Sequence, residues 1–495
     1  MKRTILRILT FLLPAFLLVS QVGWAAAPPG VLTFMTPEFV NAPLTVDDLV
    51  MTQIQKATNV TITLQVVPAA DFNTKIDALV AAHQLPDMIC IGSIQPQYSS
   101  QGVFAKLNGW LAKSATFQKL FTQFPFLLKN MKDDKGDIYF IPRMSELPWW
   151  TNEMINQNLL DKSGKSAPTN LTEFETVLKA FKALGSDVIP WETGAWMGNS
   201  FGDPVLHAFG ITQGWYDYGN KKYEYGPYDE KDAYYQYLVY MNKLWNEGLI
   251  DTSAFSISDD DIVAKLKTDK VGFNYGWADG FSLWGKGGSY GTNFVPMAAL
   301  AGPDGKSHSV VSQFMDGNVC YISASSKNID SAERVLEYIY GDEGTTLLNW
   351  GVAGQTYTEV KGTKTFTAVI TKDQMPMNKV RSLGVLHPSI PYLDTMTALA
   401  SLVGPLTAKY VDLCKNNAFP QQPFLSGTTS EQAELAGITA DVNKYVSEQS
   451  AKFITGATAI NKQSFATFIS TLESMNIKQA DTIYKAQYQR WANRN

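Results

Sequence analysis

An alternation of short apolar strands and amphipathic helices near the N-terminus is the feature that most restricts how this chain can fold. The sequence predicts strands at Val31–Met35, Val60–Val67 and Met88–Ile91, with intervening helices that begin at Thr45 and Asp71. Apolar residues recur at every second position of the middle strand, which is typical of a strand with one buried face. This order implies an α/β fold with a parallel sheet and right-handed crossovers. Ligands of such sheets bind beyond the carboxyl ends of the strands.

The length of the chain indicates two lobes. A single domain typically holds about 100–200 residues, whereas this chain has 495. We find no internal repeat and no low-complexity linker, so we expect the chain to cross between interleaved lobes several times. The expected parts are a signal peptide at 1–25, a first-lobe segment at 26–145, a second-lobe segment at 146–284, a return to the first lobe at 285–330, and a second-lobe segment with a helical extension at 331–495.

Later segments predict more helix than strand. Helical patterns cover Asn170–Ala183 and Tyr228–Glu247, a strand is expected at Lys270–Tyr275, and the chain is expected to be mostly helical from Leu393 onward. The stretch Asp133–Asp137 is interpreted as a hairpin turn rather than an ion-binding loop.

The first residues have the form of a secretory signal peptide. Lys2, Arg3 and Arg7 precede the mainly apolar stretch Ile8–Val19, and small residues follow, with cleavage expected after Ala25. A membrane anchor is the alternative, but the apolar stretch is shorter than the roughly 20 residues that a spanning helix needs. The sequence therefore predicts export.

The cysteines bear on where the exported protein would reside. Lipidation needs a cysteine at the cleavage site, and the first cysteine is Cys90, so we expect an unlipidated protein that is soluble in a periplasm. Cys90, Cys320 and Cys414 can form at most one disulfide, and buried free thiols are the alternative.

Charge and composition argue against several classes of partner and cofactor. The formal net charge is −5 and no cluster of Lys and Arg occurs, which disfavours nucleic acid and anionic lipid as partners. The four histidines are not spaced as metal ligands, so no metal is expected. The stretch Gly198–Gly202 matches a nucleophile-elbow pattern around Ser200, but no apolar strand precedes it, and a loop is the better interpretation.

Aromatic residues in polar, glycine-rich segments suggest a ligand site. An indole ring covers the apolar face of a sugar, while carboxylates, amides and guanidinium groups bond its hydroxyl rim. For each tryptophan, core packing is an open alternative, and for each arginine so is an ion pair. The candidate ligand-binding residues are Trp149, Trp150, Trp191, Glu192, Trp196, Trp277, Asp279, Trp350, Gln355, Tyr357, Arg143 and Arg381.

Seven stretches spread over nearly the whole mature chain resemble family-1 extracellular solute-binding proteins of ABC importers. The similarity is to the branch that includes lipoprotein-like and alginate-oligosaccharide-binding members. The stretches are Lys75–Ile89, Asp134–Pro142, Pro168–Lys182, Lys243–Ile250, Glu333–Gly344, Trp350–Thr358 and Tyr445–Gly456.

The resemblance implies a two-lobe periplasmic binding protein fold, with a hinge and a cleft that closes on the ligand. It implies a carbohydrate-binding protein rather than an enzyme, with no catalytic residue, which docks on the permease subunits of an ABC importer. We expect a monomer. The family's alginate binders carry a calcium loop after the helix that Pro168–Lys182 matches; here residues 183–190 are shorter and lack most of the ligands. The sequence therefore predicts no calcium at this position and no cofactor.

Two other functions remain open at this point. A secreted carbohydrate-active hydrolase is one, because Glu146, Glu192, Asp203 and Asp279 lie near the loop aromatics and two of them could form an acid–base pair. A binder of a non-sugar solute, such as a peptide, is the other.

Overall fold

The computed structural model describes residues 28–91, 96–145, 151–193, 204–277, 288, 293–308, 315–395, 397–403, 419–420 and 422–494. The predicted signal peptide, the Ser200 loop and Cys414 lie outside the described residues. No helix in these ranges combines the length and apolar character that crossing a bilayer requires.

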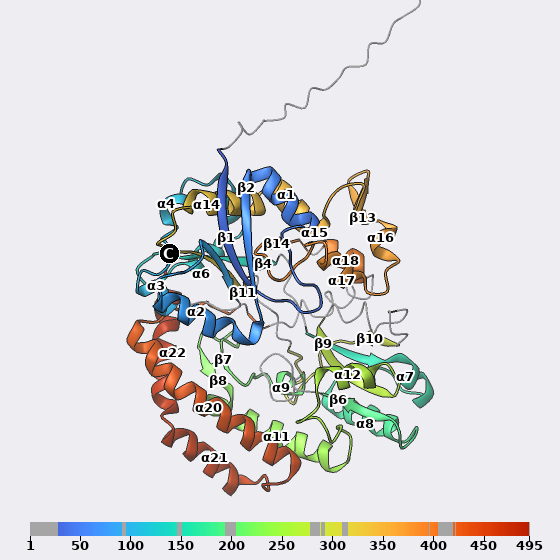
Figure 1. Cartoon of the computed structure of the whole chain (residues 1–495). Helices are drawn as coiled ribbons and strands as arrows, with labels where there is room; N and C mark the ends of the chain where they lie inside the picture. The colour runs from blue at the N-terminus through green and yellow to red at the C-terminus, as the bar shows by residue number, and fades with distance from the viewer. Residues whose placement is uncertain are drawn as a thin grey trace, which may run out of the picture.

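The first lobe is built on a six-stranded mixed sheet with the strand order β14-β4-β11-β3-β1-β2 (Figure 1). Strand β1 pairs in parallel with β2 and β3, as the sequence predicts, whereas β11 runs antiparallel between β3 and β4. Its strands are β1 (Gly30–Pro37), β2 (Val60–Val67), β3 (Met88–Ile91), β4 (Phe140–Ser145), β11 (Met315–Ile322) and β14 (Leu393–Asp394).

Amphipathic helices cover this sheet. In α14 (Ile329–Tyr340) the buried residues Ala332, Val335, Leu336 and Ile339 recur at helical spacing, so one stripe faces the sheet. The other elements of this lobe are α1 (Leu49–Thr58), η1 (Ala69–Asp71), α2 (Phe72–Ala81), α3 (Pro96–Ser100), α4 (Asn108–Leu111), α5 (Ala115–Gln123), α6 (Pro125–Met131), α15 (Asp342–Trp350), β12 (Tyr357–Val360), β13 (Thr363–Phe366), α16 (Ala368–Thr371), α17 (Pro376–Arg381) and α18 (Thr397–Val403).

Two local predictions in the first lobe have different outcomes. The helix expected to begin at Thr45 begins at Leu49, because Thr45 and Asp48 instead close a turn, in which the Thr45 hydroxyl donates to the Asp48 carboxylate at 2.7 Å. The hairpin turn at Asp133–Asp137 is confirmed, since the Asp133 N–H donates to the Asp137 carbonyl oxygen at 2.9 Å.

The second lobe contains a four-stranded sheet with the order β10-β5-β9-β6. Helix α8 starts at a side-chain cap, where Asn170 accepts the Glu173 N–H, and packs Phe174 and Phe181 into the core. The elements are β5 (Thr151–Asn156), α7 (Gln157–Ser163), α8 (Leu171–Lys182), β6 (Ile189–Glu192), α9 (Pro204–Ala208), β7 (Trp215–Tyr216), β8 (Glu224–Tyr225), α10 (Gly226–Asp229), α11 (Lys231–Asn246), α12 (Asp259–Leu266), β9 (Val271–Trp277) and β10 (Phe294–Pro296).

The last three helices form the predicted helical extension. They are α20 (Thr429–Thr455), α21 (Lys462–Ser474) and α22 (Ile477–Ala492). Helix α20 begins with a capping box between Thr428 and Glu431 and ends at Gly456, whose left-handed backbone suits glycine. Figure 1 shows these helices (red) beside α11 of the second lobe, with α22 reaching up to the first.

The lobes divide the chain differently from the expected boundaries. Strand β10 pairs with β5, so residues 294–296 belong to the second lobe rather than the first. Helices α14, α15 and α18 pack in the core of the first lobe, with Leu336, Leu348 and Leu399 buried there, although 331–495 was assigned to the second. The reason is that these helices follow β11 and cover the sheet that β11 has just joined.

Candidate functional site

The carboxyl ends of several first-lobe strands meet at one edge of the six-stranded sheet. Strands β1, β3, β4 and β14 all end there, and antiparallel β11 begins there. Asp394 lies beside Ser145 in the register of β14 and β4. This edge is where a ligand of an α/β sheet is expected.

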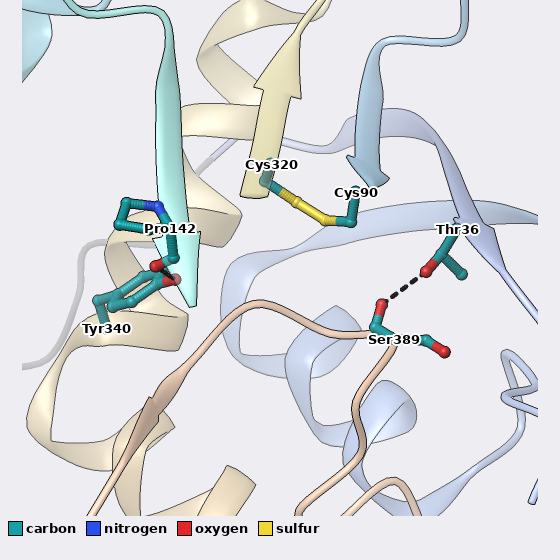
Figure 2. The surroundings of a disulfide bond; sticks show 6 residues. All are labelled: Thr36, Cys90, Pro142, Cys320, Tyr340 and Ser389. Atoms are coloured by element: carbon teal, nitrogen blue, oxygen red, sulfur yellow. Dashed lines mark hydrogen bonds between the residues drawn. A yellow bond between two sulfur atoms is a disulfide. The ribbon is translucent and has the colours of Figure 1, made fainter. Parts of the chain in front are cut away.

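A disulfide joins the two central strands near this edge (Figure 2). Cys90 of β3 and Cys320 of β11 are direct partners in the antiparallel register and are separated by 230 residues in sequence. The sequence left a disulfide and buried thiols as alternatives, and the structure has the disulfide.

Polar contacts fix the segments around the disulfide. The Thr36 hydroxyl at the end of β1 donates to the Ser389 carbonyl oxygen at 2.8 Å, and the Tyr340 hydroxyl donates to the Pro142 carbonyl oxygen at 2.7 Å (Figure 2). The cavity between Thr36, Cys90 and Ser389 measures only about 10 Å³, which is room for a single water at most. This cavity is therefore too small to hold a ligand larger than a water molecule.

Arg143 lies at the carboxyl end of β4 in a buried polar cluster. Its Nη2 donates to the Tyr392 hydroxyl at 2.9 Å and lies 3.6 Å from the Asp394 carboxylate. Its guanidinium carbon is 4.8 Å from the centroid of the Tyr392 ring. Burial raises the pKa of Tyr392 far above its usual range, so this hydroxyl keeps its proton.

Arg381 belongs to the same cluster. Its guanidinium carbon lies 5.1 Å from the Phe39 ring, which meets the His387 ring edge-on at 5.9 Å. Burial lowers the pKa of His387 to about 4; its hydrogen bond to the Ala42 carbonyl oxygen opposes this shift, and the charges of Arg381 and Arg143 add to it. His387 is therefore neutral at neutral pH, and the charges of two arginines from distant parts of the sequence both act on it.

The candidate residues on β6, Trp191 and Glu192, are buried in the interior of the second lobe. Trp191 is 1 % exposed and packs edge-on against Phe174 and Phe273, with centroids 5.4 and 5.8 Å away. The Glu192 carboxylate, also fully buried, lies 2.9 Å from the Lys265 ammonium, which contacts Asp251 at 2.6 Å. For Trp191, the structure has the core packing that the sequence left open.

The candidates after α15 lie on the first lobe. Trp350 is buried and packs against Tyr357 and Phe366, with centroids 6.0 and 4.9 Å away, beneath the β12–β13 hairpin. Gln355 is exposed. These aromatic rings are held in a core rather than presented to a ligand.

The remaining candidates are not placed by the structure. Trp277 is the last residue of β9, opposite Thr151 of β5, but its side chain is outside the described set. Trp149, Trp150, Trp196 and Asp279 lie outside the described residues. Their role in ligand binding stays a prediction.

Sequence reasoning missed four members of the arginine cluster, namely Phe39, His387, Tyr392 and Asp394. No local pattern marks them. Asp394 reaches the end of β4 through the parallel pairing of β14 with β4, and Phe39 lies far from the other three in the sequence. The sequence interpretation placed Arg143 and Arg381 in loops that could face the cleft, and this is wrong: Arg143 lies in β4 and Arg381 is the last residue of α17.

Within the described ranges, no group of three or more His, Cys, Asp or Glu residues is arranged to hold a metal ion. At the position of the family's calcium loop, residues 183–188 connect α8 to β6, and Asp187 contacts Lys270 at 2.8 Å. The expectation of no calcium here stays a prediction.

Known proteins match both the sequence and the fold. Residues 37–346 match the family described as bacterial extracellular solute-binding protein. The fructooligosaccharide ABC transporter substrate-binding protein FusA of Streptococcus pneumoniae is 25% identical over 86% of this chain and 84% of its own. The polygalacturonan/rhamnogalacturonan-binding protein YtcQ of Bacillus subtilis is 22% identical over 89% of this chain and 88% of its own.

Solved structures agree on the architecture. The alginate-binding protein AlgQ2 without calcium ion superposes with a TM-score of 0.79 at 19% identity, covering 94% of this chain and 99% of that one. A solute-binding protein of Bifidobacterium longum infantis that binds human milk oligosaccharides superposes with a TM-score of 0.77 at 18% identity, covering 94% and 99%. These likenesses show the two-lobe periplasmic binding protein fold.

Proposed function

We propose, from the premise that this chain belongs to the bacterial extracellular solute-binding protein family, that it captures an oligosaccharide between its lobes and delivers it to the permease of an ABC importer. The observation that carries the proposal is the match over more than four fifths of the chain to relatives whose names state saccharide ligands. A ligand that contacts both lobes only when they are closed favours the closed state, and this shift in population is the signal that a permease can read.

The ligand contacts are proposed on the strand ends and the segments that follow them. Trp149, Trp150, Trp196 and Trp277 supply ring faces for pyranose or furanose rings, and Asp279 accepts from hydroxyl groups. Trp191, Glu192, Trp350 and Tyr357 support this surface from the lobe cores, given the packing described above.

Arg143 and Arg381 extend the proposal to acidic saccharides. Guanidinium groups bind carboxylates through paired hydrogen bonds, and both side chains belong to the cluster around His387 and Tyr392. Arg381→Gln is expected to weaken binding of a uronate oligosaccharide more than that of a neutral one of the same length. An equal change for both would remove acidic ligands from the proposal.

The site of action is proposed to be the periplasm, with the leader removed after Ala25, no lipid attached, and the mature protein monomeric. An intact mass of the protein purified from its own cell envelope gives the mature N-terminus and any lipid directly. A mass that includes residues 1–25, or an added diacylglycerol, would contradict this part.

A thermal-shift screen of neutral and acidic oligosaccharides, followed by calorimetric titration of the hits, tests the binding function. Ligand at roughly 100 times its Kd adds about 2.7 kcal/mol to the free energy of unfolding, which raises the melting temperature measurably. Recovered sugars should be unchanged in length; turnover would make the protein a hydrolase instead. Binding of peptides but not of saccharides would overturn the choice of ligand.

The aromatic contacts are tested with matched tryptophan variants. Trp149→Ala and Trp277→Ala are each expected to weaken binding roughly ten-fold, or about 1.4 kcal/mol. The control is Trp245→Ala on α11, whose half-buried ring packs against Phe255 at 5.7 Å on the second lobe. Affinity that falls equally in the control would remove the specific role of the loop tryptophans.

A further inference from the structure

Helix α22 is anchored in the second lobe along most of its length. Ile477 is buried in that lobe's core, and Trp215 packs against Tyr484 with centroids 4.4 Å apart. One turn later, the Tyr488 hydroxyl donates to the Asp217 carboxylate, and the Tyr488 ring stacks on Tyr223 at 5.5 Å. The helix therefore moves with the second lobe.

The last turn of α22 contacts the first lobe as well as α20, where the Arg490 Nη2 donates to the Glu431 carboxylate at 2.6 Å. The Arg490 Nε donates to one oxygen of the Asp134 carboxylate at 2.6 Å, and the Arg494 Nη2 donates to the other at 2.5 Å. Arg494 also donates through Nη1 to the Lys132 carbonyl oxygen at 2.7 Å. One carboxylate of the 132–138 hairpin thus receives two guanidinium groups.

Hydrogen bonds and a cation–π contact reinforce these ion pairs. The Trp491 Nε1 donates to the Asn130 side-chain oxygen at 2.8 Å, and the Lys129 ammonium lies 4.4 Å from the Trp491 ring. Lys129 also donates to the Ala492 carbonyl oxygen at 2.9 Å. Helix α6 of the first lobe is therefore held directly to the end of the chain, which Figure 1 marks with the letter C beside it.

Residues 422–426 also connect the second lobe at Asp217 with the first lobe at Asn130 and Asp134. The Gln422 side chain is buried and bonds both backbone groups of Asp217 in the second lobe, at 2.7 and 3.1 Å. Four residues later, the Ser426 hydroxyl donates to Asp134 in the first lobe at 3.2 Å, and the Phe424 N–H donates to Asn130 at 3.2 Å. Asp217 on one side, and Asn130 with Asp134 on the other, are bridged twice.

We propose that this double bridge, formed by residues 422–426 and 488–494 and here called the inter-lobe tie, is the pivot about which the lobes open and close. Separating the lobes at the tie would break these hydrogen bonds and ion pairs together. Opening the lobes on the side away from the tie breaks none of these contacts. The proposal rests on the two-lobe function proposed above only in taking closure as the working motion.

The tie also keeps its charges over a wide pH range. Burial alone raises the pKa of Asp134, but the hydrogen bonds and charges of Arg494 and Arg490 outweigh it and lower the pKa below its usual value. The ionic contacts therefore persist through neutral and mildly acidic solutions, and salt rather than pH is the condition that weakens them.

Inter-lobe distances measured by pulsed electron spin resonance test the pivot without any ligand. Val360→Cys on the β12–β13 hairpin and Leu184→Cys after α8 are exposed labelling positions, one on each lobe, in a Cys414→Ser background. The Arg490→Ala, Arg494→Ala double variant is expected to broaden the distance distribution and shift it to longer values. The control is Lys119→Ala, which removes an exposed ion pair to Asp342 inside the first lobe.

Unchanged distances in a folded double variant would overturn the proposal. If that variant melts below the working temperature, the Arg490→Gln variant replaces it and must show the same direction of change, or the tie is not the pivot. Because no ligand is present, failure here leaves the binding function untouched, and failure to find a saccharide ligand leaves the distance result untouched.

Discussion

The two lobes complete their cores by different means. In the first lobe, strands β3 and β11 come from places 230 residues apart and are joined by the Cys90–Cys320 disulfide. In the second lobe, no disulfide occurs among the described residues, and the core relies on aromatic clusters and on α20–α22 from the end of the chain. A cross-link acts mainly by restricting the unfolded chain, whereas aromatic packing acts through buried area in the folded one. The lobes should therefore respond to different perturbations.

The largest effect is expected from Trp191→Ala. The fully buried indole packs against Phe174 and Phe273, and removing such a ring leaves a cavity that costs about 3–5 kcal/mol of unfolding free energy. Hydrogen exchange followed by mass spectrometry should show faster exchange in β6, β9 and α8 of the second lobe. Equal acceleration in β1–β3 would contradict separate cores.

The disulfide gives the converse experiment. The Cys90→Ala, Cys320→Ala double variant is expected to lose about 2–4 kcal/mol of unfolding free energy, with faster exchange in the first lobe. Cys414→Ala is the matched control and should leave exchange in β3 and β11 unchanged. A loss confined to the second lobe would show that the disulfide does not support the first.

The smallest effect concerns pH and His387. The unfolded chain binds a proton near the ordinary pKa of 6.5, but the folded first lobe binds it only near 4, because burial lowers that pKa. Stability is therefore complete above about pH 6.5 and falls as pH drops through this window, by at most about 1.4 kcal/mol per pH unit.

Urea unfolding of the parent and of His387→Asn between pH 7.5 and 5 measures this contribution. Burial also lowers the pKa of His308, so His308 contributes to the pH dependence of both proteins. The contribution of His387 is therefore the difference between the pH dependences of the unfolding free energy of the parent and of the variant. The variant should show the shallower dependence. Parallel curves would mean that His387 does not couple folding to pH.

The sequence predicted individual elements better than their assembly. Strand β2 has the predicted bounds, because alternating apolar residues report a half-buried strand directly. Helix α11 begins at Lys231, three residues after the predicted start, because Gly226–Asp229 form a separate turn of helix. The lobe to which α14 and α15 belong was not predictable. An apolar stripe shows that one face of a helix is buried, but it does not show against which sheet the helix packs.

The same limit applies to the site. Trp191 has polar and glycine neighbours like those of a ligand-facing residue, yet it lies in the core, because its ring packs between Phe174 of α8 and Phe273 of β9. Arg143 and Arg381 could be proposed one at a time, but the contacts of Arg143 with Tyr392 and Asp394 depend on the long-range pairing of β14 with β4. Local sequence patterns predict which residues are buried and where turns occur. Contacts between residues that are far apart in the sequence depend on the topology of the fold, which local patterns do not give.

Small-angle X-ray scattering of the mature protein, with and without a saccharide selected by the thermal screen, tests the central claim most directly. Capture between two lobes predicts a smaller radius of gyration and a shorter maximum dimension at saturating ligand, with the saccharide recovered intact. Saturation that leaves both dimensions unchanged, or recovery of a cleaved saccharide, would contradict capture by closure.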